Sequence, residues 1–244
     1  MGGFEALTAL LSLGAYLVCG VPFGLLVAAA MGHIDVREVG SGNIGTTNVA
    51  RSVGKGAAAL TLLLDLGKGL VWMLVARLVL ALAFFGGDFA SLDHTTAFGA
   101  ALSVVFLCCI CGHVFSPYLR FHGGKGIAVG FGAALGLYWP VGLGLLAVFL
   151  VLTVPTRYVS LGSVAAAASL PVWCALFGFP PVSIAPIALA AVIVIWSHRE
   201  NVRRLLHGEE RRFSFHKKGE RVERRDAGEG AQKDGAEKNA GAGR

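Results

Sequence analysis

Charged residues are scarce in this sequence. Asp, Glu, Lys and Arg together make up 15% of the 244 residues, whereas a soluble domain carries about 25%. The few charges are also segregated, so that long stretches hold none. Together with 55% hydrophobic residues and a mean hydropathy of +0.67, this excludes an ordinary soluble core and predicts an all-α polytopic membrane protein.

Several chemical signatures are absent as well. The five cysteines lie in or at the ends of apolar segments, without nearby His or acidic residues in a metal-type spacing, so we expect free buried thiols and no metal or cofactor. They are Cys19, Cys108, Cys109, Cys111 and Cys174. There is no G-x-S-x-G nucleophile elbow. Much of the net charge of +6 follows residue 196, which indicates membrane orientation and no nucleic-acid partner.

Apolar segments account for most of the chain. Clear membrane spans are predicted at residues 7–30, 57–85, 97–115 and 159–179. The first is long and has no preceding Lys or Arg, so we expect a span and not a cleaved signal peptide. Residues 127–154 are either one long helix or two short ones broken at Trp139-Pro140, because proline cannot donate its backbone hydrogen bond. Residues 184–196 are short for a span, since about 17 residues is the usual lower limit.

The distribution of Lys and Arg decides between these readings. The loops at residues 86–94, 139–140 and 178–183 contain no Lys or Arg, whereas the alternate loops and the C-terminal tail are basic. All basic loops face the cytoplasm only if residues 127–154 form a hairpin. We therefore predict seven transmembrane helices, with the N-terminus outside and the C-terminus cytoplasmic.

The chain becomes polar after the last apolar segment. Residues 1–210 are predicted to form an integral membrane domain, and residues 211–244 a polar cytoplasmic tail that ends rich in Gly, Ala, Glu and Lys. Such a composition cannot bury a core, so we expect the tail to be disordered. The basic stretch before it is suited to anionic lipid headgroups.

A first polar segment, residues 41–51, lies between two apolar spans. Glycines at 40, 42 and 45 allow successive backbone N–H groups to point one way, which makes a concavity suited to anions. Arginine adds a planar fork that suits phosphate. The structural alternative is a capped helix start whose arginine reaches lipid headgroups. The candidate site residues are Ser41, Gly42, Asn43, Gly45, Thr47, Asn48 and Arg51.

A second polar segment, residues 121–126, directly precedes an apolar helix. Its glycines free backbone N–H groups at the positive end of the helix dipole, and a lysine adds an ammonium. It is not a Walker A loop, because the G-x-x-x-x-G-K-[ST] spacing is missing. A plain turn at the membrane edge, with a structural histidine nearby, is the alternative. The candidates are His113, Gly123, Gly124, Lys125 and Gly126.

A third segment, residues 198–209, follows the last span. His198 and Asn201 are three residues apart and share a helix face, which Arg204 continues. The alternative is a basic helix lying on lipid headgroups. Few carboxylates accompany these segments. The nearest in sequence are Asp35, Glu38, Glu200 and Glu209.

Two charged residues inside the second span form a separate feature. Asp65 and Lys68 are three residues apart and are expected to pair, with Arg77 further along the same span. Charge within the membrane is costly and by default indicates function. A structural pair that bridges helices and a substrate contact both remain open for them.

Taken together, the polar segments resemble the motifs of the bacterial acyl-phosphate:glycerol-3-phosphate acyltransferases, the PlsY family. The resemblance covers about residues 6–210, and Asp65-x-x-Lys68-Gly69 also fits it. The matching motifs are Ser41-Gly42-Asn43-x-Gly45-x-Thr47-Asn48-x-x-Arg51, Gly112-His113 with Phe121-x-Gly123-Gly124-Lys125-Gly126-x-Ala128, and His198-x-x-Asn201-x-x-Arg204-Leu205 with Gly208 and Glu209. Acyltransferases that use soluble donors carry a His-x-x-x-x-Asp motif, which none of the seven histidines here begins.

The resemblance implies a multi-pass enzyme of the bacterial cytoplasmic (inner) membrane. It would transfer a fatty acyl group from acyl phosphate to the 1-hydroxyl of sn-glycerol 3-phosphate, giving lysophosphatidic acid and phosphate at the start of phospholipid biosynthesis. A link to the enzyme that supplies acyl phosphate is implied as well. By the same resemblance, the residues that hold glycerol 3-phosphate are Ser41, Arg51, Lys125, His198 and Asn201. Asn43, Thr47 and the glycine loops would cradle the donor phosphate.

The residues alone leave two questions open. The general base is His198, His113 or the donor phosphate itself, and the last is favoured because cations surround it and no carboxylate is placed to help. The rival function is a membrane transporter of a phosphorylated metabolite. It predicts polar residues along a path through the bilayer, and beyond Asp65, Lys68 and Arg77 few are found.

Overall fold

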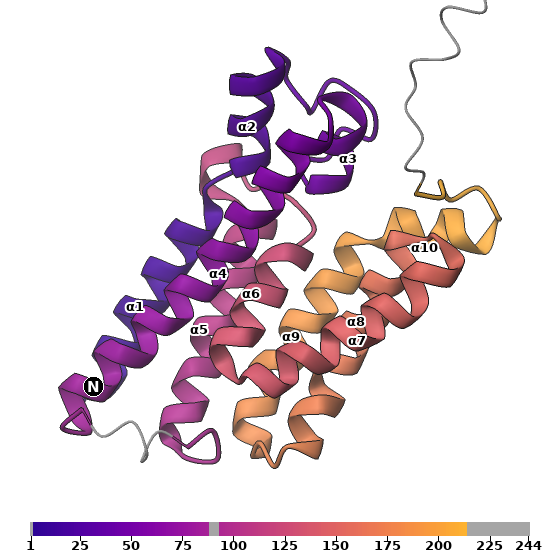
Figure 1. Cartoon of the computed structure of the whole chain (residues 1–244). Coiled ribbons are helices and arrows are strands. Elements are labelled where there is room, and N and C mark those ends of the chain that lie inside the picture. The colour runs from indigo at the N-terminus through magenta and orange to yellow at the C-terminus, as the bar shows by residue number, and fades with distance from the viewer. Residues whose placement is uncertain (1, 88–92, 214–244) are drawn as a thin grey trace, which may run out of the picture. The chain divides into compact units, whose positions relative to one another are not determined.

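A computed structural model describes residues 2–87 and 93–213 (Figure 1). Helices make up this part of the chain, and no strand occurs in it. The chain divides into two units, Met1–Arg211 and Arg212–Arg244, and the helices described here belong to the first. The α-helices are α1 Gly3–Gly20, α2 Phe23–Gly32, α3 Thr46–Ser52, α4 Lys55–Phe84, α5 Ala97–Val114, α6 Ile127–Leu137, α7 Trp139–Thr156, α8 Val159–Leu176, α9 Pro181–Ser197 and α10 Arg199–Leu206. The tail predicted to be disordered lies outside the described residues from 214 onward.

Five helical segments are long and apolar enough to cross a membrane, which makes the chain a multi-pass membrane protein. A sixth is added if α9 and α10, which meet at a bend of 57°, count as one span, and α6 is a shorter apolar helix. The five segments are Gly3–Gly32, Lys55–Phe84, Ala97–Leu119, Trp139–Thr156 and Val159–Leu176. The first, predicted as a span at residues 7–30, is interrupted between α1 and α2 at Val21-Pro22.

The apolar stretch 127–154 forms two helices and not one. Helix α6 ends at Leu137, Tyr138 has an extended backbone with φ of −158°, and α7 begins at Trp139 with Pro140 in its first turn. Proline is tolerated there because the first N–H groups of a helix have no partner within the helix. The predicted break at Trp139-Pro140 is therefore confirmed.

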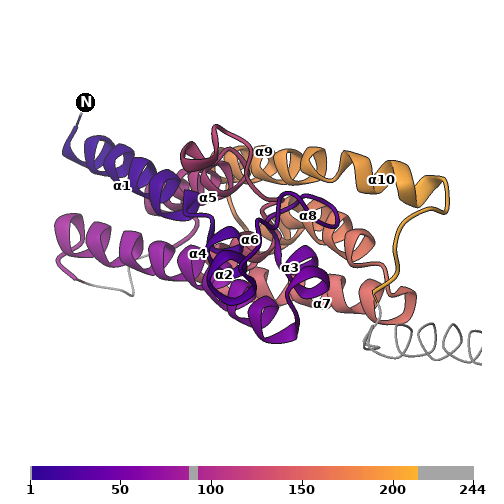
Figure 2. The same cartoon turned by 90° about the horizontal axis from the view of Figure 1, so that it is seen from above.

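Glycines bring α4 and α6 into close contact. A Cβ atom on Gly69 of α4 would fall on the backbone oxygen of Val129, and one on Gly132 of α6 would fall on that of Leu66. Between membrane helices such close approach supplies the van der Waals contact that drives association. Seen from above, α6 lies at the centre of the bundle and also contacts α5 (Figure 2). Helix α6 is therefore held by two neighbouring helices.

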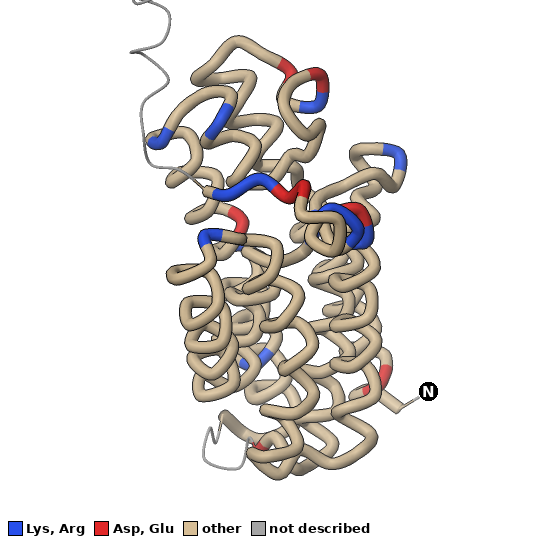
Figure 3. Tube along the Cα trace, turned by 90° about the vertical axis from the view of Figure 1, so that its right-hand side faces the viewer, with Lys and Arg blue, Asp and Glu red and all other residues tan. Residues whose placement is uncertain are grey.

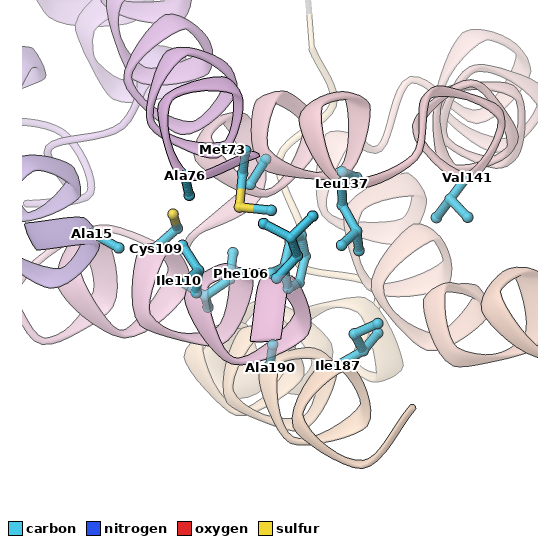
Figure 4. Packing of buried hydrophobic residues seen from close by; sticks show 14 of the residues in the cluster. Ala15, Met73, Ala76, Phe106, Cys109, Ile110, Leu137, Val141, Ile187 and Ala190 are labelled. Atoms are coloured by element: carbon cyan, nitrogen blue, oxygen red, sulfur yellow. The ribbon is translucent and has the colours of Figure 1, made fainter. Parts of the chain in front are cut away.

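The main apolar core surrounds α5. Phe106 and Ile110 of α5 lie in one cluster with Met73 of α4, Leu137 of α6 and Ile187 of α9 (Figure 4). A second, smaller cluster joins α2, α3 and the start of α4. All five cysteines are free, as predicted, but only three are buried: Cys108 and Cys111 are half-buried. The segment with α2 and α3 thus packs on its own small core at one end of the bundle.

The two ends of the bundle differ in chemistry. Most Lys and Arg of the described residues lie at the end that carries α3 and α10 (Figure 3). At the opposite end the turns are aromatic: the His94 ring lies 4.6 Å from that of Tyr138 and 4.6 Å from that of Phe179. These residues come from the loop before α5, the α6–α7 turn and the α8–α9 turn, so three turns meet at one end.

Candidate active site

A hydrogen bond between Lys125 and Asn201 joins two of the polar segments. The Lys125 ammonium, in the loop before α6, donates to Oδ1 of Asn201 on α10. Asn201 is buried and Lys125 is half-buried. The two motifs are 76 residues apart in sequence, so only the fold brings them together.

Glu210 completes this cluster. Its Oε1 accepts hydrogen bonds from Asn201 Nδ2 and from the Ser160 hydroxyl at 2.8 Å each, and its Oε2 accepts one from Arg204 Nε at 2.8 Å. Burial raises the pKa of this carboxyl, but the three hydrogen bonds outweigh it, so the net pKa lies below its usual value. Glu210 is therefore an ionised anchor for the neighbouring donors.

The sequence analysis missed Glu210 and singled out Glu209, whose side chain is exposed. Helix α10 ends at Leu206, and Gly208 adopts a left-handed backbone with φ of 71°. Such a glycine turns the chain back after a helix. As a result Glu210, and not Glu209, contacts the side chains of α10. The spacing Gly208-x-Glu210 was the signal available in the sequence.

Cations outnumber carboxylates around Glu210. The charges of Arg204 and Arg211 both act on Arg51 of α3, and partial desolvation is the main cause that lowers the Arg51 pKa. Desolvation, followed by the charge of Arg204, lowers the pKa of Lys125 to about 8, although Glu210 opposes this. Arg51 and Lys125 repel each other and the neighbouring arginines. A bound anion would relieve this repulsion, so the cluster favours one.

His198 lies at the junction of α9 and α10 beside this cluster. Its Nδ1 is 2.8 Å from the Val194 carbonyl oxygen, and its side chain is buried. A carbonyl oxygen can only accept, so Nδ1 carries the proton and Nε2 of the neutral ring is an acceptor. Lys125 and Glu210 both lie within electrostatic range of this ring. His198 and Asn201, predicted to share a helix face, are thus both part of the cluster.

The loop before α3 is shaped by its own side chains. Asn48 Nδ2 donates to the carbonyls of Val36 and Val39 at 2.9 and 3.0 Å, and its Oδ1 accepts from Ser41 N at 3.0 Å. Asn43 Oδ1 accepts from Gly45 N at 2.8 Å. Asn48 is consequently a buried support of the loop. Its predicted contact with substrate stays a prediction.

The backbone of this loop uses the freedom of glycine at two of the three expected positions. Gly40 and Gly42 have φ of 66° and 69°, a region that favours glycine. Gly45 has φ of −79° and is the residue before α3. Ser41 and Gly42 are exposed, Thr47 is half-buried, and within the described residues no bond links them to Lys125 or Asn201. They lie at the same end of the molecule as Arg51.

The glycines of the second segment fold back on the end of α5. Gly123 N donates to the Val114 carbonyl at 2.9 Å, and Gly124 N donates to the His113 carbonyl at 3.0 Å. A Cβ atom on Gly124 would fall on His113 Nε2. His113 is 4% exposed and lies behind the loop, so its predicted substrate contact stays a prediction. Gly126 is left-handed, with φ of 83°, where the chain enters α6.

An apolar groove begins next to Lys125. It runs between α5, α6, α7, α8 and α9, and Gly126 is one of its walls. Its lining combines glycine and alanine with larger apolar side chains. The lining includes Phe106, Ile110, Gly130, Leu145, Ala167 and Ala191. A cationic cluster thus adjoins a slot suited to a hydrocarbon chain.

Comparison with known proteins identifies the family. The family described as "Glycerol-3-phosphate acyltransferase" matches residues 9–208. The chain belongs to this family. The glycerol-3-phosphate acyltransferase of Rubrobacter xylanophilus is 42% identical over 207 residues, which cover 85% of this chain and 96% of the relative. That of Geobacter sulfurreducens is 43% identical over 199 residues, covering 82% and 94%.

Solved structures of the glycerol-3-phosphate acyltransferase family show the same fold. The crystal structure of PlsY (YgiH), an integral membrane glycerol 3-phosphate acyltransferase, in its glycerol 3-phosphate form is 32% identical with a TM-score of 0.74, and covers 85% of this chain and 96% of its own. The lysophosphatidic acid form is 31% identical with a TM-score of 0.72, covering 85% and 95%. The resemblance to PlsY drawn from the sequence is confirmed.

Nothing in the described part of this acyltransferase is arranged to hold a metal. No group of three or more His, Cys, Asp or Glu side chains that could hold a metal ion occurs there. The cluster instead offers an ammonium, guanidinium groups, an amide and a neutral imidazole. Such groups can hold phosphates and orient a hydroxyl without an enzyme-bound acyl intermediate.

Proposed function

We propose that the protein transfers a fatty acyl group from acyl phosphate to the 1-hydroxyl of sn-glycerol 3-phosphate, giving lysophosphatidic acid and phosphate. This is the first acylation of phospholipid biosynthesis. The observation that carries the proposal is the cationic cluster of Lys125, Arg51 and Arg204 at the mouth of an apolar groove. Both reactants carry a phosphate, and one also carries a fatty chain.

The roles of the site residues follow from this placement. Lys125, Arg51, His198, Asn201 and Ser41 hold glycerol 3-phosphate. The first four lie in or next to the cluster around Glu210, which supports the assignment. Donor phosphate is cradled by the glycine loops. The residues that we place around it are Gly42, Asn43, Gly45, Thr47, Asn48, His113, Gly123, Gly124 and Gly126.

The acyl chain of the donor occupies the groove beside Gly126. A chain seated there would bring its carboxyl end to the Lys125 side, because the groove begins at that residue's neighbour. In this arrangement the reacting carbonyl would lie beside the positive cluster. Holding both reactants in line can supply several kcal/mol toward the barrier.

The reaction needs no protein nucleophile. The 1-hydroxyl oxygen attacks the acyl carbonyl carbon, and the bond from that carbon to the phosphate oxygen breaks. Acyl phosphate is a mixed anhydride, so phosphate leaves readily, and we assign it the hydroxyl proton. His198 offers an acceptor Nε2 and is the alternative base. His113 is less suited, because its Nδ1 faces Lys68.

The same proposal covers the topology. Seven spans, with the N-terminus outside and the C-terminus cytoplasmic, are supported by two observations. The α6–α7 turn at Tyr138 meets the other lysine- and arginine-free turns, and the basic residues gather at the opposite end, which the positive-inside rule makes cytoplasmic. The active site then faces the cytoplasm.

Three further assignments belong to this proposal. Residues 1–210 form the catalytic membrane domain, and residues 211–244 form a cytoplasmic tail outside it. The protein lies in the bacterial cytoplasmic (inner) membrane, surrounded by lipid. It receives acyl phosphate from the enzyme that makes it. The family match over residues 9–208 supports placing the activity in the first part.

A transporter of a phosphorylated metabolite fits less well. Its polar path would have to use the charges within the spans. Lys68 lies 2.8 Å from Asp65, and Arg77 Nη1 donates to the Leu137 carbonyl at 3.0 Å. These charges are occupied by protein groups and form no continuous path.

A turnover assay tests the proposal. Purified protein in detergent should convert acyl phosphate and glycerol 3-phosphate to lysophosphatidic acid without added metal, coenzyme A or carrier protein. Activity with acyl-CoA but not with acyl phosphate would refute it. Uptake of glycerol 3-phosphate into proteoliposomes without chemical change would favour the transporter instead.

Two charge removals test the site assignment. Lys125→Ala and Arg51→Ala should each lower kcat/KM by at least about 100-fold, the loss typical of removing a group that stabilises charge in the transition state. Arg37→Ala is the matched control, because Arg37 is exposed and pairs only locally with Asp35 at 2.5 Å. Near-normal turnover of both cluster variants would remove the assignment.

A further inference from the structure

A buried ionic cluster lies behind the glycine loop, among α1, α4 and α5. The Lys68 Nζ atom is 2.8 Å from Asp65 Oδ1, 2.8 Å from the Val21 carbonyl oxygen and 3.1 Å from His113 Nδ1. The side chains of Asp65, Lys68 and His113 are 3–4% exposed. The ammonium also lies 5.4 Å from the centre of the Phe23 ring. Lys68 is therefore hydrogen-bonded to Val21 and His113 and forms an ion pair with Asp65.

These contacts fix which nitrogen of His113 carries the proton. An ammonium can only donate, so the imidazole Nδ1 that faces it must accept. The proton of the neutral ring then lies on Nε2. This nitrogen is the one against Gly124, where a Cβ atom would fall on it. Lys68 thus directs the N–H of His113 toward the glycine loop.

The glycine loop connects this cluster to the proposed substrate site. Gly124 N donates to the backbone oxygen of His113 at 3.0 Å, and the next residue is Lys125, which bonds Asn201. A rotated or displaced His113 ring would move Gly124, and with it the Lys125 ammonium. Catalysis is sensitive to this, since a misplacement of about 1 Å can lower a rate about 100-fold.

The Lys68 ammonium also bonds to the break between α1 and α2 in the first span. Val21 lies between α1 and α2, and its carbonyl oxygen accepts from Lys68. The segment that begins there leads through α2 to the loop of Ser41 and to α3. Lys68 is therefore bonded to Val21, where the chain that leads to the first polar segment begins, and to His113, which lies against the second polar segment.

Stability alone gives little reason for this arrangement. A buried ion pair costs so much desolvation that well-packed apolar residues of the same volume are often equally stable or more so. Asp65 and Lys68 lie on one helix, three residues apart, so their bond to each other does not tie helices together. The contacts to His113 and Val21 are the ones that cross between elements.

We propose that Asp65 and Lys68 are positioning residues for acyl transfer: through the Lys68–His113 contact they hold the His113 Nε2–H against Gly124 and so place the Lys125 loop. Asp65 balances the charge of Lys68 and orients it. The proposal rests on the assignment of Lys125 to a substrate phosphate. Neither residue touches the substrates, so they act through His113.

The tautomer of His113 is the first test, and it needs no activity. The ¹⁵N-histidine spectrum of the full-length protein in detergent micelles should show His113, assigned with His113→Gln, protonated at Nε2 and unprotonated at Nδ1. A ring protonated at Nδ1 overturns the proposal. This outcome is independent of whether Lys125 binds phosphate, so it separates failure here from failure of the proposed function.

Paired variants supply the second test. Asp65→Asn/Lys68→Met removes both charges together, which leaves no unpaired charge in the core, and also removes the donor to His113. We expect it to fold, to lose the fixed Nε2–H tautomer, to raise the KM for glycerol 3-phosphate and to lower kcat/KM about 10- to 100-fold. Lys68→Arg keeps a charged donor and should retain the tautomer and more of the activity.

A purely structural role predicts other results. It would reduce the amount of folded protein and leave the KM of the remainder unchanged. Thr61→Val on α4 is the control, because Thr61 is buried on the same helix, its hydroxyl has no partner among the described residues, and valine keeps its shape. If the Asp65→Asn/Lys68→Met variant has wild-type KM and kcat, the proposal is overturned. A Lys68→Arg variant that folds but is as inactive as Asp65→Asn/Lys68→Met would overturn it too.

Discussion

Lys125 shows how burial tunes a single residue for its task. Desolvation is the main cause that brings its pKa down to about 8, and the neighbouring charges of Arg204 and Arg51 add to it. An ammonium with a lowered pKa is poorly stabilised by its surroundings. A phosphate bound beside it would restore this stabilisation, so the site favours an anionic ligand before any contact is optimised.

A pH profile follows from this pKa. The lysine is charged below about pH 8 and loses its proton as the pH rises, so kcat/KM for glycerol 3-phosphate should fall on the alkaline side, approaching about tenfold per pH unit. At saturating substrate the bound phosphate raises the pKa, and the fall in kcat should begin at higher pH. Initial rates of lysophosphatidic acid formation measure both.

Lys125→Arg is the control for this profile. Arginine stays protonated throughout this range, so whatever activity it retains should not show the alkaline fall. An unchanged alkaline limb in the arginine variant would mean that another group titrates. A flat wild-type profile would contradict the role of the Lys125 charge.

Single residues also mark where sequence reasoning succeeded and where it failed. The pairing of Asp65 with Lys68 was predictable from helical spacing alone. Glu210 was not recognised, because the turn at Gly208 decides which of two adjacent glutamates faces α10. The amide of Asn48 supports the loop, and its substrate contact stays a prediction. Residue type indicates chemistry, whereas the direction of a side chain depends on the fold.

Among the elements, α6 and its preceding loop matter most for function. Glycines pack α6 against α4, and the loop before it folds back onto α5 through two backbone hydrogen bonds. The loop therefore places Lys125 on one side of Gly126 and the groove on the other. A short helix held on several sides is a rigid support for a site.

Filling the groove should affect long acyl chains selectively. Ala191 on α9 is one of the groove residues, and Ala191→Leu adds three carbons to the slot. Overpacking of this kind costs about 1–3 kcal/mol, so we expect kcat/KM with palmitoyl phosphate to fall about tenfold or more and that with a short-chain acyl phosphate to change less. The KM for glycerol 3-phosphate should stay near its wild-type value.

Ala185→Leu is the matched control for groove filling. Ala185 lies on the same helix with its side chain exposed on the outside of the bundle, so leucine there meets lipid. Equal losses for long and short donors in Ala191→Leu would show that the groove does not hold the acyl chain.

At the scale of the whole molecule, function depends on which side of the membrane each turn faces. All substrates of the proposed reaction must reach the basic end. We expect Thr95→Cys and Trp139→Cys to react with an impermeant maleimide from outside in spheroplasts, because both residues lie at the aromatic end of the bundle. His122→Cys, exposed in the loop of the basic end, should react only after permeabilisation.

The wild-type protein gives the background for this labelling, since its native cysteines are buried or half-buried. Labelling of Trp139→Cys only from the inside would mean that α6 and α7 enter and leave on the cytoplasmic side, and would refute seven spans. Labelling of His122→Cys from outside would reverse the proposed orientation.

The sequence by itself determined the class of protein and the chemistry of its site. Apolar length and the placement of Lys and Arg indicated a helical membrane protein with a break at Trp139-Pro140, because these properties act through local chain physics. The motif residues indicated phosphate binding. Tertiary structure alone decided that Glu210 joins Asn201 and Arg204, that Lys68 faces His113, and that a groove begins at Gly126. The contact between Lys68 and His113, 45 positions apart, depends on helix packing, and those of Glu210 with Asn201 and Arg204, 9 and 6 positions away, depend on how the chain turns at Gly208. No local pattern specifies either.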